Sequence, residues 1–403
     1  MNAPPLSDLR VLDLSHQYAG GLAACLLADL GAQVVVVEHP RGSPMRTMLP
    51  QKDGESLWWK VVGRGKRGIT LDLSTPRGRE LSLRLASQFD VLIENFRPGT
   101  MERWGLGPDD LATVCDRLVM LRISGFGQNG PLRERPGFGT VAEAMSGFAH
   151  LNGRPMDPPV FPSTTLADGV AGTFGALGVL AALTASPGRD ARGVQVVDMA
   201  LFEGLFRLIP TQLPTFDQLG IAPKRPGNFL GSHGVLRNLY ETADGVYFVV
   251  SAIGQAPISR IIEAAEATDL VERLPDVLQN GDPDVFEAFL GQADDVVTAW
   301  AHGNQWADVS AALTETGAAF QRVYDAQDIT NDPHFQARGD LLRVADAKLG
   351  SILMAGVVPK FPGRRLDVRS AGPELGEHND QIYSELLGLT ASDLSELREA
   401  AVI

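Results

Sequence analysis

Cysteine is nearly absent from this 403-residue sequence, which holds only Cys25 and Cys115. Two cysteines cannot build a disulfide framework or a cysteine-rich metal site, and Cys25 lies in an apolar helical stretch, so both are expected to be buried structural thiols. The seven histidines show no spacing typical of metal ligands. The sequence therefore predicts neither redox chemistry, nor a metal, nor a permanently bound cofactor.

An excess of positive charge and long apolar stretches are also missing. The net charge of −14 argues against nonspecific binding to DNA or to anionic membranes, although local basic clusters can still hold an anionic ligand. The start, MNAPPLSDLR, lacks the basic-then-apolar order of a secretory signal, and Gly, Asp or Arg interrupt the apolar stretches before they reach membrane-spanning length. We expect a cytoplasmic protein with no nucleic-acid or membrane partner.

The length favours two domains, and the first half of the chain alternates strand and helix patterns. Alternation of this kind is typical of an α/β fold, in which helices cover a parallel sheet. The segments expected to be helical are 20–30, 77–88 and 141–148, and the expected strands are 10–15, 33–38, 69–73, 91–94, 118–124 and 193–197.

The second half has a different composition. Residues 213–238 are poor in periodicity and rich in Pro, Gly and basic residues, which is typical of a linker or an active-site loop. The pattern of residues 239–251 predicts a hairpin around Asp244-Gly245, and the residues after it, to about 316, predict acidic amphipathic helices. A smaller domain is therefore expected here. Beyond it, residues 343–358 predict further strands.

Two features favour an NAD-dependent oxidoreductase. Residues 10–38 predict a βαβ unit whose second strand ends in an acid, but the turn LSHQYAGG lacks the G-x-G-x-x-G pattern that brings backbone against a pyrophosphate. GFGQNG at 125–130 has that pattern, but Pro131 and loop-type residues follow it where the phosphate-binding helix should begin. We interpret 125–130 as a glycine-rich loop, and the NAD hypothesis is weakened.

The segment 164–183 contains a single charged residue, Asp168. With Thr164 or Thr165 as N-cap of a helix, Asp168 lies in the first turn, where free backbone N–H groups favour a carboxylate. It shares a helix face with Gly172, Gly175 and Val179, so a ligand or another chain segment could approach closely. The pattern alone favours an ordinary helix-start carboxylate on a buried helix over a nucleophile.

Six segments, taken in order along the chain, carry a resemblance. They are DLSHQYAGGLAACLLADLGAQVVVVE at 13–38, GRGKRGITLDL at 63–73, VLIENFRPGTMERWGL at 91–106, ISGFGQNGPLRERPGF at 123–138, LADGVAGTFGALGVLAAL at 166–183 and LGEH at 375–378. Together they resemble one family, the class III CoA-transferases, which includes formyl-CoA and carnitine CoA-transferases and the α-methylacyl-CoA racemases. The resemblance covers nearly the whole chain, and it favours a functional role for Asp168 over a purely structural one.

The resemblance implies a fold with two domains. Residues 1–212 would begin a Rossmann-like large domain, 213–238 would form a linker, 239–325 a small α+β domain, and 326–403 a return segment that completes the large domain. It also implies an interlocked homodimer, whose active sites lie between the large domain of one subunit and the small domain of the other.

The chemistry implied by the resemblance is covalent. The aspartate matching Asp168 attacks an acyl-CoA thioester, and the enzyme carries CoA as an aspartyl thioester until a carboxylic acid collects it. A reference pKa of about 3.9 and a helix N-terminus would both keep such a nucleophile ionised. CoA and acyl-CoA are then substrates, and the second partner is a small carboxylic acid.

The resemblance also implies a CoA pocket. Cations would hold the phosphates, and residues at the end of the first strand would form part of the wall. Lys66, Asn95, Phe96 and Arg103 match the family positions best. The full set of expected CoA-binding residues is His16, Gln17, Tyr18, Ala19, Arg41, Lys66, Asn95, Phe96, Arg97 and Arg103.

Phe138 distinguishes the two branches of the family. In the racemases the position after Arg135-Pro136-Gly137 is a histidine that moves the α-proton, and a phenyl ring cannot carry a proton. Phe138 could instead wall the acyl pocket, or it could be a core aromatic. We therefore expect a CoA-transferase, with an acyl-CoA racemase or epimerase, an NAD-dependent oxidoreductase and a non-catalytic acyl-CoA-binding protein as alternatives.

The acceptor side of the pocket is expected in and after the linker. Gly231 and Gly234 in FLGSHG resemble a shortened form of the family's mobile glycine-rich loop. The acceptor is expected to be a short acid, for example a dicarboxylic or hydroxylated one, and Arg225, Arg237 or Asn238 would bind its distal carboxylate.

Overall fold

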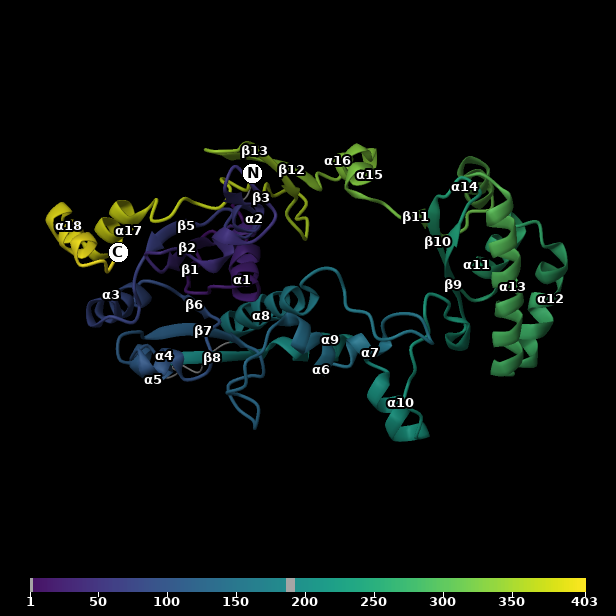
Figure 1. Cartoon of the computed structure of the whole chain (residues 1–403), viewed down its shortest axis with the longest axis horizontal. Coiled ribbons are helices and arrows are strands. Elements are labelled where there is room, and N and C mark those ends of the chain that lie inside the picture. Colours follow the sequence, from purple (N-terminus) through teal and green to yellow (C-terminus); the bar gives the residue numbers. More distant parts are fainter. Residues whose placement is uncertain (1–2, 186–192) are drawn as a thin grey trace. The chain divides into compact units, whose positions relative to one another are not determined.

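The computed structural model describes residues 3–185 and 193–403, and the chain packs as two compact units (Figure 1). The first unit comprises Met1–Phe148, Phe161–Pro214 and His334–Ile403, and the second comprises Ala149–Val160 and Thr215–Pro333. The second unit therefore extends beyond the small domain expected at 239–325, because most of the expected linker and the segment Ala149–Val160 pack with it.

A parallel sheet of six strands forms the centre of the first unit, in the order β5-β2-β1-β6-β7-β8 (Figure 1). The chain builds outward from β1 to β2 and β5, returns to β6 beside β1, and builds outward again to β8. In such sheets ligands bind beyond the carboxyl ends of the strands where the order reverses, which here is between β1 and β6. The strands are β1 (Arg10–Asp13), β2 (Gln33–Glu38), β5 (Arg67–Thr70), β6 (Val91–Glu94), β7 (Arg117–Ser124) and β8 (Gly193–Ala200).

Side chains of successive strand residues enter opposite layers, since strand side chains alternate between the two faces. Leu12 of β1 packs in a core with α3 and the C-terminal helices, whereas its neighbour Val11 packs in a core with α1, α8 and α9. The helices of this part are α1 (Tyr18–Asp29), α2 (Leu57–Val62), α3 (Pro76–Ala86), α4 (Thr100–Arg103), α5 (Pro108–Ala112), α6 (Gly139–Met145), α8 (Leu166–Thr184) and α9 (Leu201–Leu208), with short elements η1 (Pro44–Thr47), β3 (Gln51–Lys52) and β4 (Glu55–Ser56). Two more helices, α7 (Phe148–Leu151) and α10 (Gln212–Leu219), begin in the first unit and have most of their residues in the second.

The predicted parallel α/β sheet is confirmed, and so is the interpretation of GFGQNG. After β7 the chain has no helix until α6 begins at Gly139, so no helix N-terminus follows the glycines to receive a phosphate. A Cβ atom on Gly125 would lie 2.8 Å from the Cα of Gly137. The segment between β7 and α6 therefore begins and ends with its backbone in direct contact.

α8 differs from the expectation that no apolar stretch reaches membrane-spanning length. By length and composition it is the one helix in residues 3–185 and 193–403 that could cross a membrane. It packs against α1, α9, β7 and β8, as the core helix of a globular unit does, and a single helix of this kind is weak evidence for a membrane span.

The C-terminal part of the first unit is tied to the edge strand β5 by His378, the last residue of the LGEH segment, and by the next residue, Asn379. His378 Nδ1 accepts a hydrogen bond from the Gly68 N–H (3.1 Å), and Asn379 Oδ1 accepts one from the Thr70 N–H (2.8 Å). These bonds occupy backbone groups that an edge strand otherwise exposes. The segment also holds α16 (Pro333–Ala337), the hairpin β12 (Leu341–Asp346) and β13 (Gly350–Ala355), α17 (Asn379–Leu387) and α18 (Ala391–Glu399).

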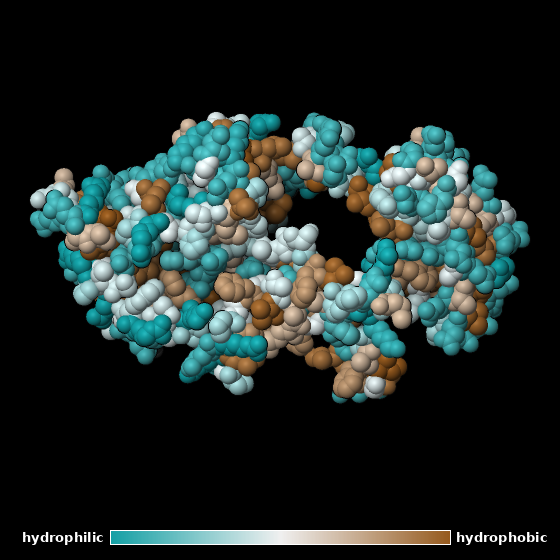
Figure 2. Space-filling model, in the orientation of Figure 1, coloured by the Kyte–Doolittle hydropathy of each residue, from teal (hydrophilic) through white to brown (hydrophobic). Residues whose placement is uncertain are grey.

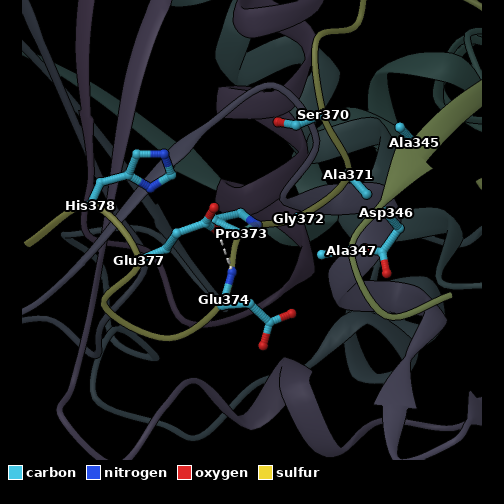
Figure 3. A pocket seen from close by; sticks show the side chains of 10 residues that line it. All are labelled: Ala345, Asp346, Ala347, Ser370, Ala371, Gly372, Pro373, Glu374, Glu377 and His378. Atoms are coloured by element: carbon cyan, nitrogen blue, oxygen red, sulfur yellow. Dashed lines mark hydrogen bonds between the residues drawn. The ribbon is translucent and has the colours of Figure 1, made fainter. Parts of the chain in front are cut away.

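A small cavity of about 120 Å³ lies where this C-terminal part meets α2, lined by residues 345–347 and 370–374 with Glu377 and His378 (Figure 3). Lys60 of α2, almost fully buried, ends beside it and contacts Glu55, Asp346 and Glu374 at 3.1, 2.9 and 2.9 Å. None of the predicted site residues lines this cavity. Its ion pairs fasten the C-terminal segment to the first part of the chain.

The second unit is an antiparallel sheet, β11-β10-β9, covered by helices. The hairpin predicted around Asp244-Gly245 is present, but its first strand begins at Val235 because Val235–Asn238 already pair with β10. The elements are β9 (Val235–Glu241), β10 (Tyr247–Ile253), β11 (Phe320–Arg322), η2 (Gly231–His233), α11 (Gln255–Ala264), α12 (Thr268–Asn280), α13 (Pro283–Gly303), α14 (Trp306–Glu315) and α15 (Ala326–Asn331).

Candidate active site

Asp168 lies in the first turn of α8, as predicted, with Thr165 as N-cap. The side chain of Thr165 makes no capping hydrogen bond, and its Oγ1 is buried with no hydrogen-bond partner among the described residues. The position of the helix start was therefore predicted correctly, but not a capping hydrogen bond by Thr165.

The glycine face of α8 is occupied by the protein itself. A Cβ atom on Gly172 would lie 2.6 Å from the Ala19 carbonyl oxygen, and one on Gly175 would lie 3.0 Å from the side chain of Leu121. These glycines let α1 and β7 approach, so they do not leave an open space for a thioester. The close approach to the carboxylate comes from Gly139 instead, where a Cβ atom would lie 2.0 Å from Asp168 Oδ2.

The Asp168 carboxylate has an unusual electrostatic environment. Burial, and then the negative charge of Glu143, raise the pKa of Asp168 to about 6, against a smaller lowering by its own backbone N–H. The expectation that the helix N-terminus governs this carboxylate is therefore corrected, since desolvation outweighs it. At pH 7 the group is still mostly ionised, because the pH then lies about one unit above its pKa.

Glu143 of α6 is the second acid at this position. Its side chain is 2% exposed, and its Oε1 accepts a hydrogen bond from the Ala167 N–H, 3.3 Å away, in the first turn of α8. No basic side chain in residues 3–185 and 193–403 forms an ion pair with Glu143 or Asp168. Glu143 is therefore buried and Asp168 half-buried, and neither is paired with a cation among the described residues.

The predicted residues at the ends of β1 and β6 do come together. The His16 N–H donates to Asn95 Oδ1 (2.9 Å), and the rings of His16 and Phe96 meet edge to face with centroids 4.8 Å apart. Burial lowers the pKa of His16, which favours the neutral imidazole. These side chains lie at the reversal point of the sheet, where a ligand is expected.

The start of α1 links this point to Asp168. Gln17 is the N-cap of α1, Tyr18 its first residue and Ala19 a buried residue of its first turn. A Cβ atom on Gly169 would lie 3.9 Å from the Tyr18 hydroxyl, and the pKa of Tyr18 is raised first by burial and also by the charge of Asp168. The Tyr18 ring packs edge to face on Trp58. The reversal point and the carboxylate thus border on the same short segment.

Lys66 is placed differently from the expectation. Its side chain is buried, and its Nζ lies 2.8 Å from both Asp13 Oδ2 and the Gly21 carbonyl oxygen. The ammonium group is therefore engaged inside the fold, and we correct its expected role as a phosphate donor. Arg41, Arg97 and Arg103 are exposed, with Arg103 also donating to Thr100 Oγ1 (2.9 Å).

Phe138 is the N-cap of α6 and is 66% exposed, so the core-aromatic interpretation is wrong. It directly precedes Gly139, the glycine that touches Asp168. An apolar ring that this unit does not bury is available as a wall for an apolar or weakly polar ligand.

The remaining predicted residues lie in the second unit. Gly231 and Gly234 line a cavity of about 360 Å³ together with Phe286. The Arg225 guanidinium donates to the carbonyl oxygens of His150, Arg154 and Asp157. The amide of Asn238 donates to Asp294. The side chains of Arg225 and Asn238 are therefore engaged within the second unit. The only side-chain hydrogen bond of Arg237 among the described residues runs from its Nε to the Asn228 carbonyl oxygen.

Two residues next to Asp168, Gly139 and Glu143, were missed as site candidates. Gly139 has no side chain that would mark it as functional, and Glu143 lies within VAEAMSGF, an apolar segment that predicts an ordinary helix. The available signal was the isolation of Glu143, because a lone acid on the inner face of a short helix needs a reason to be buried.

Comparison with known proteins identifies the class. Residues 6–379 match the sequence profile of CoA-transferase family III. Over 403 residues, and 99% of this chain, the sequence is 39% identical to the succinyl-CoA–D-citramalate CoA-transferase of Chloroflexus aurantiacus and 36% identical to the beta subunit of the succinyl-CoA–L-malate CoA-transferase of the same organism, in each case covering 98% of the relative.

A crystal structure of a CAIB/BAIF family protein from Brucella suis is also similar, with a TM-score of 0.82 and 28% sequence identity, over 96% of this chain and 100% of that one. The chain belongs to CoA-transferase family III. It is an enzyme, and its activity is the transfer of CoA between acids. The family and enzyme class predicted from the sequence are confirmed, and the oxidoreductase, racemase and non-catalytic alternatives are set aside.

Proposed function

We propose that Asp168 is the nucleophile of this CoA-transferase and that the acceptor is a short hydroxylated dicarboxylic acid. The observation that carries the proposal is the placement of Asp168, a half-buried carboxylate with no ion pair among the described residues, beside the start of α1 at the reversal point of the sheet. A carboxylate kept free of cations retains its electron pairs for attack.

In the proposed reaction an Asp168 carboxylate oxygen attacks the thioester carbon of the donor, and the carbon–sulfur bond breaks with the electron pair leaving on the CoA thiolate. The thiolate then attacks the Asp168 carbonyl carbon of the mixed anhydride and releases the donor acid as a carboxylate. The acceptor carboxylate attacks the resulting aspartyl thioester, and the thiolate, released again, takes the acceptor's acyl group from the second anhydride. Asp168 returns as a carboxylate, and no permanently bound cofactor takes part.

The proposed CoA site extends from the reversal point of the sheet. Exposed arginines can neutralise phosphates there, and the ring of Phe96 offers an apolar surface. Lys66 contributes indirectly, since its ammonium group holds Asp13 at the end of β1. The residues assigned to CoA are His16, Gln17, Tyr18, Ala19, Arg41, Asn95, Phe96, Arg97 and Arg103.

The acceptor class is taken from two relatives that are named for citramalate and malate, both hydroxylated dicarboxylic acids, and for succinyl-CoA as donor. Arg237 is the proposed partner of the distal carboxylate, because its terminal guanidinium nitrogens have no hydrogen-bond partner in residues 3–185 and 193–403. Phe138 and the glycines at 231 and 234 are proposed to form further walls of the acyl site.

The test is incubation with succinyl-CoA followed by intact-mass and peptide analysis. A CoA adduct on Asp168 that disappears when L-malate or citramalate is added supports the proposal, and the absence of any adduct with reactive donors would overturn the nucleophile. Replacing Arg237 by Ala should raise the KM for dicarboxylic acceptors at least tenfold and leave that for a monocarboxylic acid unchanged. Equal effects on both would remove Arg237 from the acceptor site.

We also propose that the enzyme is an interlocked homodimer working in the cytoplasm, a reducing compartment in which its two buried free cysteines stay thiols. The support for a dimer is α10, which has no buried residue and whose Leu213, Phe216 and Leu219 are 58, 59 and 66% exposed. Brown, hydrophobic atoms gather at its place in Figure 2. A mass of one chain by light scattering, independent of concentration, would contradict the dimer, and Phe216→Asp should weaken it.

A further inference from the structure

The starting point is the contact between α6 and the first turn of α8, which lie side by side with α9 (Figure 1). α6 begins at Gly139, directly against Asp168 Oδ2, and one turn later it supplies Glu143, whose Oε1 accepts from the Ala167 N–H. Ala167 is the residue immediately before Asp168. Glu143 is therefore fastened to the backbone that carries the nucleophile.

The charges on the other elements packed against α8 are engaged elsewhere or exposed. Tyr18 of α1 faces Asp168 as a neutral phenol whose pKa is raised, first by burial. Two of the other charged groups form ion pairs: Asp29 of α1 with Arg64, and Arg122 of β7 with Glu94 and Glu102. Asp198 of β8 accepts from the Gln128 N–H, and Glu203 of α9 accepts from the Ala200 N–H. Arg117 and Arg207 are exposed. Glu143 is thus the charged group that acts on Asp168.

We propose that Glu143 is a positioning residue that acts through Asp168: it holds the first turn of α8 by the Ala167 N–H and sets an unneutralised negative charge beside the nucleophile. The proposal rests on Asp168 being the nucleophile. It adds a role for an acid that touches neither CoA nor acceptor in the proposed reaction.

The consequence lies in the charge change during the reaction. Free Asp168 is an anion and is repelled by Glu143, whereas Asp168 joined to CoA through a thioester is neutral and is not. The same charge that raises the pKa of Asp168 therefore also favours the CoA-loaded enzyme over the free one, because proton and acyl group both remove the negative charge. Glu143 would keep the enzyme loaded with CoA between donor and acceptor.

The test compares Glu143→Gln with the wild type. Glutamine retains an oxygen that can accept from the Ala167 N–H and removes only the charge. We expect the acidic limb of the kcat/KM profile, near pH 6 in the wild type, to move to lower pH. At equal concentrations of succinyl-CoA and succinate, intact mass measures the ratio of CoA-loaded to free enzyme. This ratio should fall about tenfold for each pH unit by which the limb moves.

Two further variants separate the charge from the hydrogen bond. Glu143→Asp keeps the charge on a shorter side chain, so it should restore part of the loaded fraction. Glu203→Gln removes another carboxylate next to α8, on α9, and should leave both the limb and the loaded fraction as in the wild type. A merely structural role for Glu143 would lower the melting temperature and kcat without moving the pH limb.

Each outcome decides the proposal. Wild-type enzyme that forms the Asp168 adduct, together with a Glu143→Gln variant that has the same limb and the same loaded fraction, overturns the role of Glu143 and leaves the nucleophile intact. Wild-type enzyme without an adduct overturns the proposed nucleophile itself. If Glu143→Gln does not fold, ¹³C titration of Asp168, assigned with Asp168→Asn, is compared between the wild type and Glu143→Met, which also removes the charge: a lower midpoint in the variant supports the proposal, and an equal midpoint overturns it.

Discussion

Two aspartates of the first unit, Asp13 and Asp168, have opposite environments. Asp13, at the end of β1, is fully buried, and Lys66 Nζ lies 2.8 Å from its Oδ2 while the Ser15 N–H donates to its Oδ1 (3.0 Å). Asp168 has an acid, Glu143, as its charged neighbour, and neither acid forms an ion pair within residues 3–185 and 193–403. The fold therefore neutralises Asp13, which serves structure, and leaves without a cation the two carboxylates that are assigned to the reaction.

Replacing Asp168 by Asn should show the largest difference in function between the two aspartates. The amide cannot attack a thioester, so we expect kcat to fall at least about 10³-fold, while the folded unit and CoA binding persist. Steady-state transfer from succinyl-CoA and calorimetric CoA binding measure this. The matched control is Asp109→Asn, an exposed first-turn aspartate of α5, which should retain full activity.

Removing the cation from the other aspartate tests stability instead. Lys66→Met leaves Asp13 buried and unpaired, which should lower the free energy of unfolding by about 3–5 kcal/mol, measured by urea denaturation. Arg67→Met, which removes a half-exposed pair with Glu385, should cost about 1 kcal/mol or less. If Lys66→Met leaves stability unchanged but raises the KM for acyl-CoA, Lys66 contacts the phosphates after all.

Gly139 sharpens the comparison by geometry. In Gly139→Ala the new methyl group must displace the Asp168 carboxylate, because its Cβ would lie 2.0 Å from Oδ2. A displacement of this order should lower kcat about 100-fold. Gly291→Ala in α13, where a Cβ atom meets nothing within 4 Å, should keep full activity and gain about 0.5–1 kcal/mol of stability. Equal activity of the two variants would show that Gly139 does not constrain the nucleophile.

The smallest expected effect is a pH dependence of stability. Because folding raises the pKa of Asp168 to about 6, its contribution to stability is fully present below its unfolded pKa of about 4 and is lost as the pH rises through 6. Asp168→Asn removes that loss. The variant should therefore melt at a higher temperature than the wild type at pH 7.5, and the difference should vanish at pH 4. A difference independent of pH would contradict the raised pKa.

Local pattern was enough to predict the sheet. β2 and β6 have the predicted bounds, and β1, β5, β7 and β8 differ by a few residues at their ends, since apolar runs bounded by turns specify strands through nearest neighbours in sequence. The glycine-rich loop at 125–130 was predicted correctly from Pro131 and the loop-type residues that follow it, where a phosphate-binding helix would have to begin.

Long-range pairing could not be predicted in the same way. Lys66 and Asp13 are 53 positions apart, and nothing in either segment indicates that this lysine is turned inward while Arg41, Arg97 and Arg103 are exposed. The same holds for Asp168 and Glu143, because burial and charge coupling are properties of the packed helices. Arg225 was expected to hold a substrate, yet it binds three carbonyl oxygens of residues 150–157, a loop far from it in the sequence.

The closure of β5 by the C-terminal segment has a consequence for biosynthesis. The edge of β5 emerges from the ribosome about three hundred residues before His378 and Asn379, and the Asp72 N–H finds its acceptor only in Val402. Throughout that interval the nascent sheet presents unpaired backbone groups of the kind that recruit other strands. The first unit can therefore close only after residues 378–402 have left the ribosome, and products that lack them should associate through this edge.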